Sequence, residues 1–140
     1  MKKNVLVAIA TTLLLTACAC DQQMHAKKMG SPAIDPETPG VFVLDDKIIV
    51  VGQEPIFFAK GKQNVRITWH LPTDYKNYRF PKDGIVIKDP GDEIVDCHVE
   101  QNGLRFSCLN KHSRPGKYKY TIKVEGSPPV PPLDPIIVND

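Results

Sequence analysis

The chain has 140 residues, of which 18 are Lys or Arg and 16 are Asp or Glu, so its formal net charge is only +2. No block of basic residues is interleaved with aromatic ones, and this composition argues against nucleic acid as a partner. The length fits one domain of about 100 residues with an extension.

The first residues have the pattern of an export signal. Lys2 and Lys3 form a basic head, residues 5–15 are mostly apolar, and small residues follow up to Cys18. The apolar stretch is shorter than the roughly 20 residues that a membrane-spanning helix needs. We therefore predict that residues 1–17 are a signal peptide.

The sequence Leu-Thr-Ala-Cys that ends at Cys18 resembles the lipobox of bacterial lipoproteins. In that family the cysteine is acylated and becomes the first residue of the mature protein, so the resemblance implies a membrane anchor on Cys18. The next residue is Ala19 and not the Asp that favours inner-membrane retention, which implies a periplasm-facing protein on the outer membrane. The alternative is an ordinary secretory signal that has a cysteine near its end.

Residues 18–40 combine Pro and Gly with scattered charges and few large apolar side chains, so we predict a flexible tether. Short apolar runs then alternate with turn residues, at 41–44, 47–51, 55–59, 65–69, 84–87, 94–99, 104–108, 118–124 and 136–138. No helical periodicity lasts for three turns. Short strands at intervals of roughly ten residues predict that 41–140 is one all-β domain, a β-sandwich or small barrel.

Two of the runs show which side chains should face the core. Odd-numbered positions of 65–69 and even-numbered positions of 118–124 are apolar, as expected of half-buried strands. Residues 127–135 contain five prolines, which lack the backbone donor that a central strand needs. We expect this segment to be extended and 136–138 to close an edge of a sheet.

Cys97 and Cys108 are predicted to form a disulfide. They flank Asn102 and Gly103, a dipeptide that favours a two-residue type I′ hairpin turn. A hairpin centred there pairs residues whose numbers sum to 205, which places the two cysteines opposite each other. A two-residue turn puts them at a hydrogen-bonded pair, where Cα atoms are farther apart, and a bulge or a wider loop would relieve this. An exported compartment permits the bond and leaves Cys20 as an odd thiol.

Two stretches resemble cupredoxins: Lys-Gly at 60–61 before the run 65–69, and Pro-Gly-Lys-Tyr-Lys-Tyr at 115–120. The family has its copper cysteine two residues beyond that last tyrosine, where this chain has Ile122, and no His or Met follows. A blue-copper centre needs two histidines and a thiolate. The resemblance therefore implies a Greek-key sandwich of cupredoxin-like or immunoglobulin-like topology, without a cofactor and with Ile122 packed inward.

Histidines provide the other metal-binding hypothesis. His25 lies between Met24 and Met29 in the predicted tether, a composition that can bind copper weakly. His98 and His112 flank the predicted disulfide, but oxidised cysteines offer no thiolate beside them. A solvated linker and surface loops explain the same residues without a metal, and we predict no metal site.

The residues between 69 and 81 concentrate aromatic side chains among charged ones. If they are exposed, a binding surface is formed by Trp69, Tyr75, Tyr78 and Arg79. Alternatively, Trp69, Tyr78 and Phe80 plug the end of the sandwich and only Tyr75 is exposed.

No nucleophile motif surrounds Ser107, and the acidic residues occupy turns, so we predict no catalytic residue and no enzyme. Pro-Gly-Lys-Tyr at 115–118 and Leu-Asp-Pro at 133–135 also resemble small proteobacterial lipoproteins of unknown function. The sequence thus predicts a lipid-anchored envelope protein that binds another protein or a ligand. A metal-handling lipoprotein for copper or zinc is the alternative, and an unrecognised hydrolase is the third hypothesis.

Overall fold

The computed structural model describes residues 34–140, and within them nearly all regular structure is β-strand. The one exception is a short 3₁₀ turn, η1 (Gln101–Gly103). The strands are β1 (Val41–Leu44), β2 (Ile48–Val51), β3 (Ile56–Phe58), β4 (Val65–His70), β5 (Tyr78–Arg79), β6 (Ile85–Ile87), β7 (Ile94–Glu100), β8 (Arg105–Asn110), β9 (Gly116–Ile122), β10 (Glu125–Gly126) and β11 (Ile136–Asn139). No helix in this part of the chain is long and apolar enough to cross a membrane.

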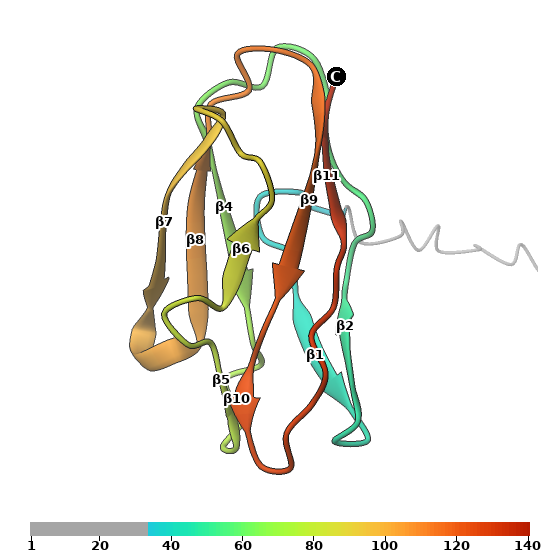
Figure 1. Cartoon of the computed structure of the whole chain (residues 1–140), viewed down its shortest axis with the longest axis vertical. Helices are drawn as coiled ribbons and strands as arrows, with labels where there is room; N and C mark the ends of the chain where they lie inside the picture. The colour runs from blue at the N-terminus through green and yellow to red at the C-terminus, as the bar shows by residue number, and fades with distance from the viewer. Residues whose placement is uncertain (1–33) are drawn as a thin grey trace, which may run out of the picture. The chain divides into compact units, whose positions relative to one another are not determined.

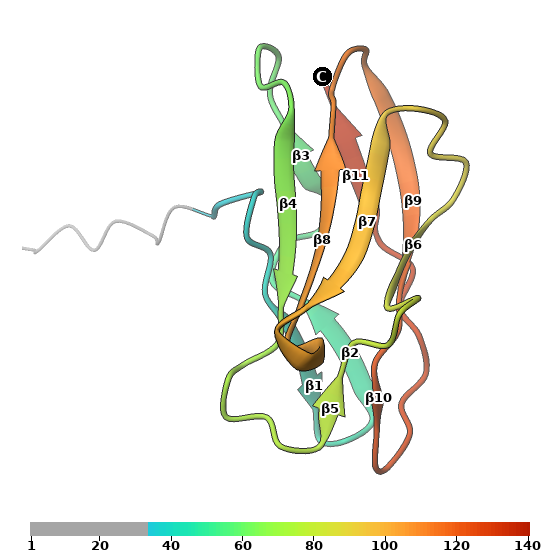
Figure 2. The ribbon, with the colours of Figure 1, turned by 90° about the vertical axis from the view of Figure 1, so that its left-hand side faces the viewer.

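Two sheets face each other and form a β-sandwich (Figure 1). One sheet has the strand order β4-β8-β7, and the other has the order β3-β11-β9-β6. The two-stranded pairs β1-β2 and β5-β10 extend the end of the sandwich opposite the C-terminus (Figures 1 and 2). Every strand pairing is antiparallel except that of β3 with β11. The all-β sandwich expected from the sequence is confirmed.

The core is formed by the inward-facing residues that strand alternation predicts. In β4 the buried positions are Val65, Ile67 and Trp69. In β9 and the two residues after it they are Tyr118, Tyr120, Ile122 and Val124. Ile122 is fully buried, in agreement with the prediction that it packs inward. The whole hydrophobic core lies between Val41 and Ile137, within a compact unit that spans Pro32–Asp140. This unit therefore contains the core and the disulfide that it needs to fold by itself.

β11 is an interior strand, which corrects the expectation of an edge. β3 pairs with it in parallel on one side, and β9 pairs with it antiparallel on the other. The five prolines of residues 127–135 all precede β11, so the backbone N–H groups of β11 remain available to pair with β3 and β9. The Pro-rich segment itself is tied to β9, because Ile122 forms a bridge with Leu133.

The domain begins before Val41, inside the segment that the sequence assigns to the tether. The N–H of Thr68 donates to the carbonyl of Glu37 at 2.8 Å, and that of His70 donates to the carbonyl of Pro39 at 3.2 Å. Residues 37–40 therefore cover the open edge of β4, which would otherwise present unpaired backbone groups. The tether, as a separate segment, ends before them.

Two buried asparagines connect the facing sheets. Asn110 at the end of β8 and Asn139 in β11 are 0% and 2% exposed. Each amide nitrogen donates to the other side chain's oxygen, at 2.8 and 3.0 Å, and Oδ1 of Asn110 also accepts the N–H of His112 at 3.2 Å. Buried amides satisfied in this way act as a polar clamp between the two layers.

Candidate functional site

The β7–β8 hairpin has the predicted register. The pairs His98–Ser107 and Glu100–Arg105 both sum to 205. The turn is wider than a type I′ turn, however, because pairing stops at Glu100–Arg105 and residues 101–104 form the loop. Gly103 has φ +84°, and a Cβ there would lie 2.8 Å from Cβ of Arg79. The turn also contacts the residue after β5, since the N–H of Phe80 donates to the Gly103 carbonyl at 2.7 Å, and a local dipeptide rule contains no information about this contact.

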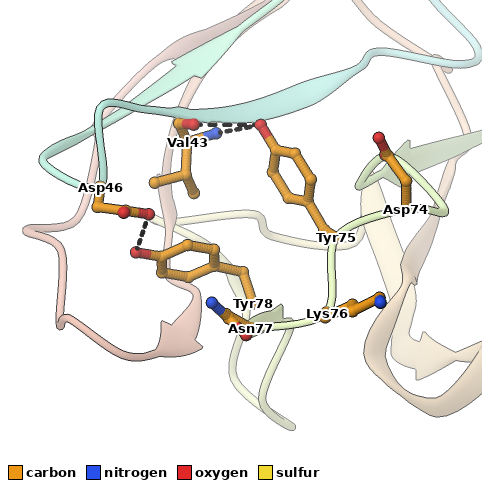
Figure 3. Close-up of a pocket in the computed structure, with 7 residues that line it drawn as sticks. All are labelled: Val43, Asp46, Asp74, Tyr75, Lys76, Asn77 and Tyr78. Atoms are coloured by element: carbon orange, nitrogen blue, oxygen red, sulfur yellow. Dashed lines mark hydrogen bonds between the residues drawn. The ribbon is translucent and has the colours of Figure 1, made fainter.

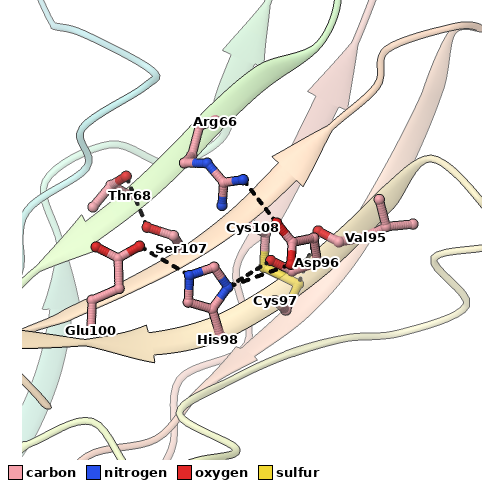
Figure 4. Close-up of a disulfide and its surroundings, with 9 residues drawn as sticks. All are labelled: Arg66, Thr68, Val95, Asp96, Cys97, His98, Glu100, Ser107 and Cys108. Carbon is pink, nitrogen blue, oxygen red and sulfur yellow. Dashed lines mark hydrogen bonds and ion pairs between the residues drawn. A yellow bond between two sulfur atoms is a disulfide. The ribbon is translucent and has the colours of Figure 1, made fainter.

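The disulfide between Cys97 and Cys108 is present, which confirms the prediction (Figure 4). The two Cα atoms are 4.1 Å apart. β7 has a bulge between Val95 and His98, where Asp96 has φ +51°. The bulge and the wider turn together allow the close approach that a regular two-residue hairpin would not. Cys108 is fully buried in the core, whereas Cys97 lies exposed on the edge strand.

An ion-pair network covers the outer face of the β4-β8-β7 sheet beside the disulfide (Figure 4). Arg66 donates to Asp96 at 2.8 Å, and this hydrogen bond lowers the pKa of the Asp96 carboxyl. The Nε2 atom of His98 lies 3.2 Å from Oε1 of Glu100, and its Nδ1 atom lies 3.0 Å from the main-chain oxygen of Asp96. Solvent screens pairs that are exposed in this way, so they stabilise the edge strand only modestly.

The two histidines near the disulfide do not converge on one site. His98 pairs with Ser107 and is exposed on β7, whereas His112 lies beyond the end of β8, five residues after Ser107. His112 is 5% exposed, and its Nε2 atom lies 2.9 Å from the main-chain oxygen of Asp140. Within residues 34–140, no group of three or more His, Cys, Asp or Glu side chains is placed to hold a metal ion. The metal-handling hypothesis thus has no support in this part of the chain, and Cys18, Cys20, Met24, His25 and Met29 lie outside the described residues.

The aromatic side chains at the end of the sandwich are mostly part of the core. Trp69, Tyr78 and Phe80 are 0%, 4% and 3% exposed. Nε1 of Trp69 donates to the hydroxyl of Tyr120 at 3.4 Å, and burial raises the pKa of that hydroxyl. Trp69 and Tyr78 therefore plug the sandwich, which corrects their assignment to an exposed binding surface and agrees with the second interpretation.

Tyr75 and Arg79 are the partly exposed members of the predicted surface, and both are held in place. The hydroxyl of Tyr75 accepts the N–H of Val43 at 3.2 Å and donates to the Val43 carbonyl at 3.1 Å. Nη1 of Arg79 donates to the carbonyls of Tyr75 and Tyr78, both at 2.6 Å. Arg79 thus fixes the loop, and Tyr75 fastens the loop to β1.

These contacts enclose a shallow pocket of about 320 Å³ between the β1–β2 turn and the loop before β5 (Figure 3). Its lining consists of Val43, Asp46, Asp74, Tyr75, Lys76, Asn77 and Tyr78. The hydroxyl of Tyr78 donates to Oδ1 of Asp46 at 2.9 Å, and burial together with this carboxylate raises the pKa of the hydroxyl. The sequence missed Val43 and Asp46, because only the folded β1–β2 hairpin brings them to the loop.

Carboxylates, an amide and an ammonium group surround an apolar wall in this pocket. Such a lining can hydrogen-bond a polar group of a ligand or a partner protein. Its chemistry therefore suits binding.

Glu93 is a buried acid whose function is structural. It is 1% exposed and accepts the N–H of Ser113 at 2.9 Å, while the Ser113 hydroxyl bonds the same carboxylate. Nε of Arg114 lies 3.6 Å from it. The hydrogen bonds from Ser113 lower the pKa of Glu93, with a smaller contribution from Arg114. The carboxylate caps backbone groups next to a turn, as the sequence suggested for the acidic residues.

Comparison with models of known protein families found no match for the chain, and no curated protein matches it.

Proposed function

We propose that the chain is a lipid-anchored, non-enzymatic protein of the bacterial cell envelope, attached through Cys18 to the outer membrane and facing the periplasm. Its sandwich domain binds a partner protein or a ligand at the pocket formed by the β1–β2 turn and residues 74–78. The lipobox sequence supports the anchor, and the Cys97–Cys108 disulfide supports an oxidising compartment.

The observation that carries the binding function is the fixed polar lining of this pocket. The Tyr75 hydroxyl is bonded twice to Val43, and Tyr78 is bonded to Asp46, so the two walls are joined before any ligand arrives. A preorganised surface loses little conformational entropy on binding. The exposed side chains of Asp74, Lys76 and Asn77 extend from this frame as potential contacts.

Site-specific photo-crosslinking in cells of the host tests the binding function. A photoreactive residue at Lys76 should give a discrete adduct, because this position borders the pocket. The matched control is Lys60, an exposed lysine in the connection between β3 and β4, at the other end of the sandwich (Figure 2). Asp74→Ala should weaken the adduct at position 76. Equal adducts at both positions, or none at position 76, would refute the proposed site.

We propose a Greek-key connectivity for the sandwich, of the cupredoxin-like or immunoglobulin-like kind. The nested pairing of strands supports it: β7 and β8 form a hairpin in one sheet, while β6 and β9 pair in the other. Ile122 in the core supports a cupredoxin-like framework without copper.

A further inference from the structure

The β1–β2 hairpin is apolar on both of its faces. All eight residues of its two strands are Val, Ile, Leu or Phe. Val41, Val43 and Ile49 point inward and are 0%, 8% and 5% exposed. The outward positions are paired across the strands, Phe42 with Val50 and Leu44 with Ile48. We call these four side chains the outer hairpin face.

The outer hairpin face differs from the outer face of the β4-β8-β7 sheet, and the exposed Phe57 and Val86 of the other sheet lie apart from each other on β3 and β6. Phe42, Leu44 and Ile48 are 38%, 46% and 52% exposed. In contrast, the outward positions of β4 begin with Arg66 and Thr68, and those of β9 include Lys117 and Lys119. Antiparallel strands with one side in water normally alternate apolar and polar residues. Four adjacent outward apolar residues indicate that this side contacts something other than water.

The hairpin presents this face on a fixed backbone. The Tyr75 hydroxyl holds Val43 in β1, and the N–H of Gly52 after β2 donates to the carbonyl of Gly40 at 2.7 Å. The outer hairpin face therefore exists before it meets a partner, and only its side chains need to adjust.

We propose that the outer hairpin face lies against the lipid surface of the membrane that anchors the chain. This inference rests on the proposed acylation of Cys18. The 15 residues 19–33 separate that cysteine from the described domain, and fully extended they reach at most about 50 Å. The domain thus stays close to the bilayer, where a high effective concentration makes a small apolar contact sufficient.

Size and charge favour a lipid surface over a second copy of the chain. A stable dimer buries about 800 Å² of each partner, far more than four side chains that are at most 52% exposed can supply. At the turn of the hairpin, Asp46 is bonded to Tyr78, and Asp45 and Lys47 balance each other in charge. The contact is therefore apolar and should depend little on salt or on anionic lipid.

Flotation of residues 32–140 with phosphatidylcholine vesicles tests the contact, at a millimolar lipid concentration that replaces the effective concentration supplied by the anchor in the full chain. The domain should float with vesicles at both low and high salt. The double variant Phe42→Ser/Ile48→Ser should lower the partition coefficient about tenfold, because it removes two apolar side chains from the contact. The matched control is Phe57→Ser, since Phe57 is 46% exposed but lies on β3 in another sheet.

Amide hydrogen exchange of the unsubstituted domain provides a second measurement that does not depend on how the variants fold. Vesicles should slow exchange in residues 41–51 more than in β9. The proposal is overturned if the domain does not float, if Phe57→Ser weakens flotation as much as the double variant, or if the domain forms dimers through this face. The double variant in the full chain should still incorporate palmitate, so failure of the contact and failure of the anchor are distinguishable.

Discussion

The clamp between Asn110 and Asn139 allows a quantitative test of how the two sheets are held together. Asn110→Ala removes both amide–amide hydrogen bonds and the acceptor of the His112 N–H. Three buried groups then lack a partner, Nδ2 and Oδ1 of Asn139 and the N–H of His112, and each costs about 1–3 kcal/mol. We therefore expect the free energy of unfolding to fall by about 4 kcal/mol.

Asn139→Ala should be milder, at about 2–3 kcal/mol, because Oδ1 of Asn110 keeps the His112 N–H as a partner and only its Nδ2 loses one. The double alanine variant should lose less than the sum of the single variants, with a coupling of about 1–3 kcal/mol. Replacing both asparagines with leucine should restore part of the stability, since no polar group is then left unpaired.

Urea unfolding followed by the fluorescence of Trp69 measures these changes, because this tryptophan is fully buried against Tyr120. The reasoning fails if Asn139→Ala is at least as destabilising as Asn110→Ala. It also fails if the two single effects add within about 0.5 kcal/mol, the limit expected of independent sites.

Three further outcomes follow from the structure. Cys97 and Cys108 are 11 positions apart in the sequence, and replacing both with alanine opens the loop that their disulfide closes. The free energy of unfolding, measured by urea unfolding, should fall by about 2–3 kcal/mol. Gly126→Ala should lower the melting temperature, since a Cβ there would lie 2.2 Å from Cδ1 of Tyr78 and would force β10 away from β5. The lowered pKa of Glu93 predicts stability that is present above pH 4.5 and lost as pH falls through the folded-state pKa, and Glu93→Gln should weaken this acid dependence.

For each of these three predictions, a different result would contradict the reasoning. Unchanged stability of the disulfide variant after the loop is opened would show that β7 does not need the bond. Gly52→Ala is the control for Gly126, because the nearest atom to its Cβ is 3.6 Å away, and equal losses for both would remove the steric explanation. For Glu93, an unaltered slope of stability between pH 5 and pH 3 in the glutamine variant would assign the acid dependence to other groups.

Local patterns in the sequence were sufficient for the individual strands. The alternation in residues 65–69 identified the buried side of β4, because one face of this strand contacts the core along its whole length. The register around Asn102 and Gly103 was also correct, since any turn centred there pairs Cys97 with Cys108. These features depend on neighbours that are close in the sequence.

Features that depend on distant residues were not predictable in this way. The short strands β5 and β10 form because Gly126 permits a close approach to Tyr78, a contact across 48 positions of sequence (126 minus 78). The interior position of β11 depends on β3, which lies near the start of the domain. In the candidate site, Val43 and Asp46 reach the loop of Tyr75 only after the hairpin docks. Apolar runs in β1 and β2 were recognised as strands, but their exposed side was visible only in the folded chain.

Metabolic labelling with palmitate tests the lipid anchor most directly. The full chain, expressed in a bacterium that processes lipoproteins, should incorporate the label and begin at Cys18 when its mature N-terminus is mapped. Cys18→Ala should abolish the label and leave unprocessed precursor. A chain that is not labelled, or a Cys18→Ala variant that is labelled as strongly as the unsubstituted chain, would contradict the proposed attachment.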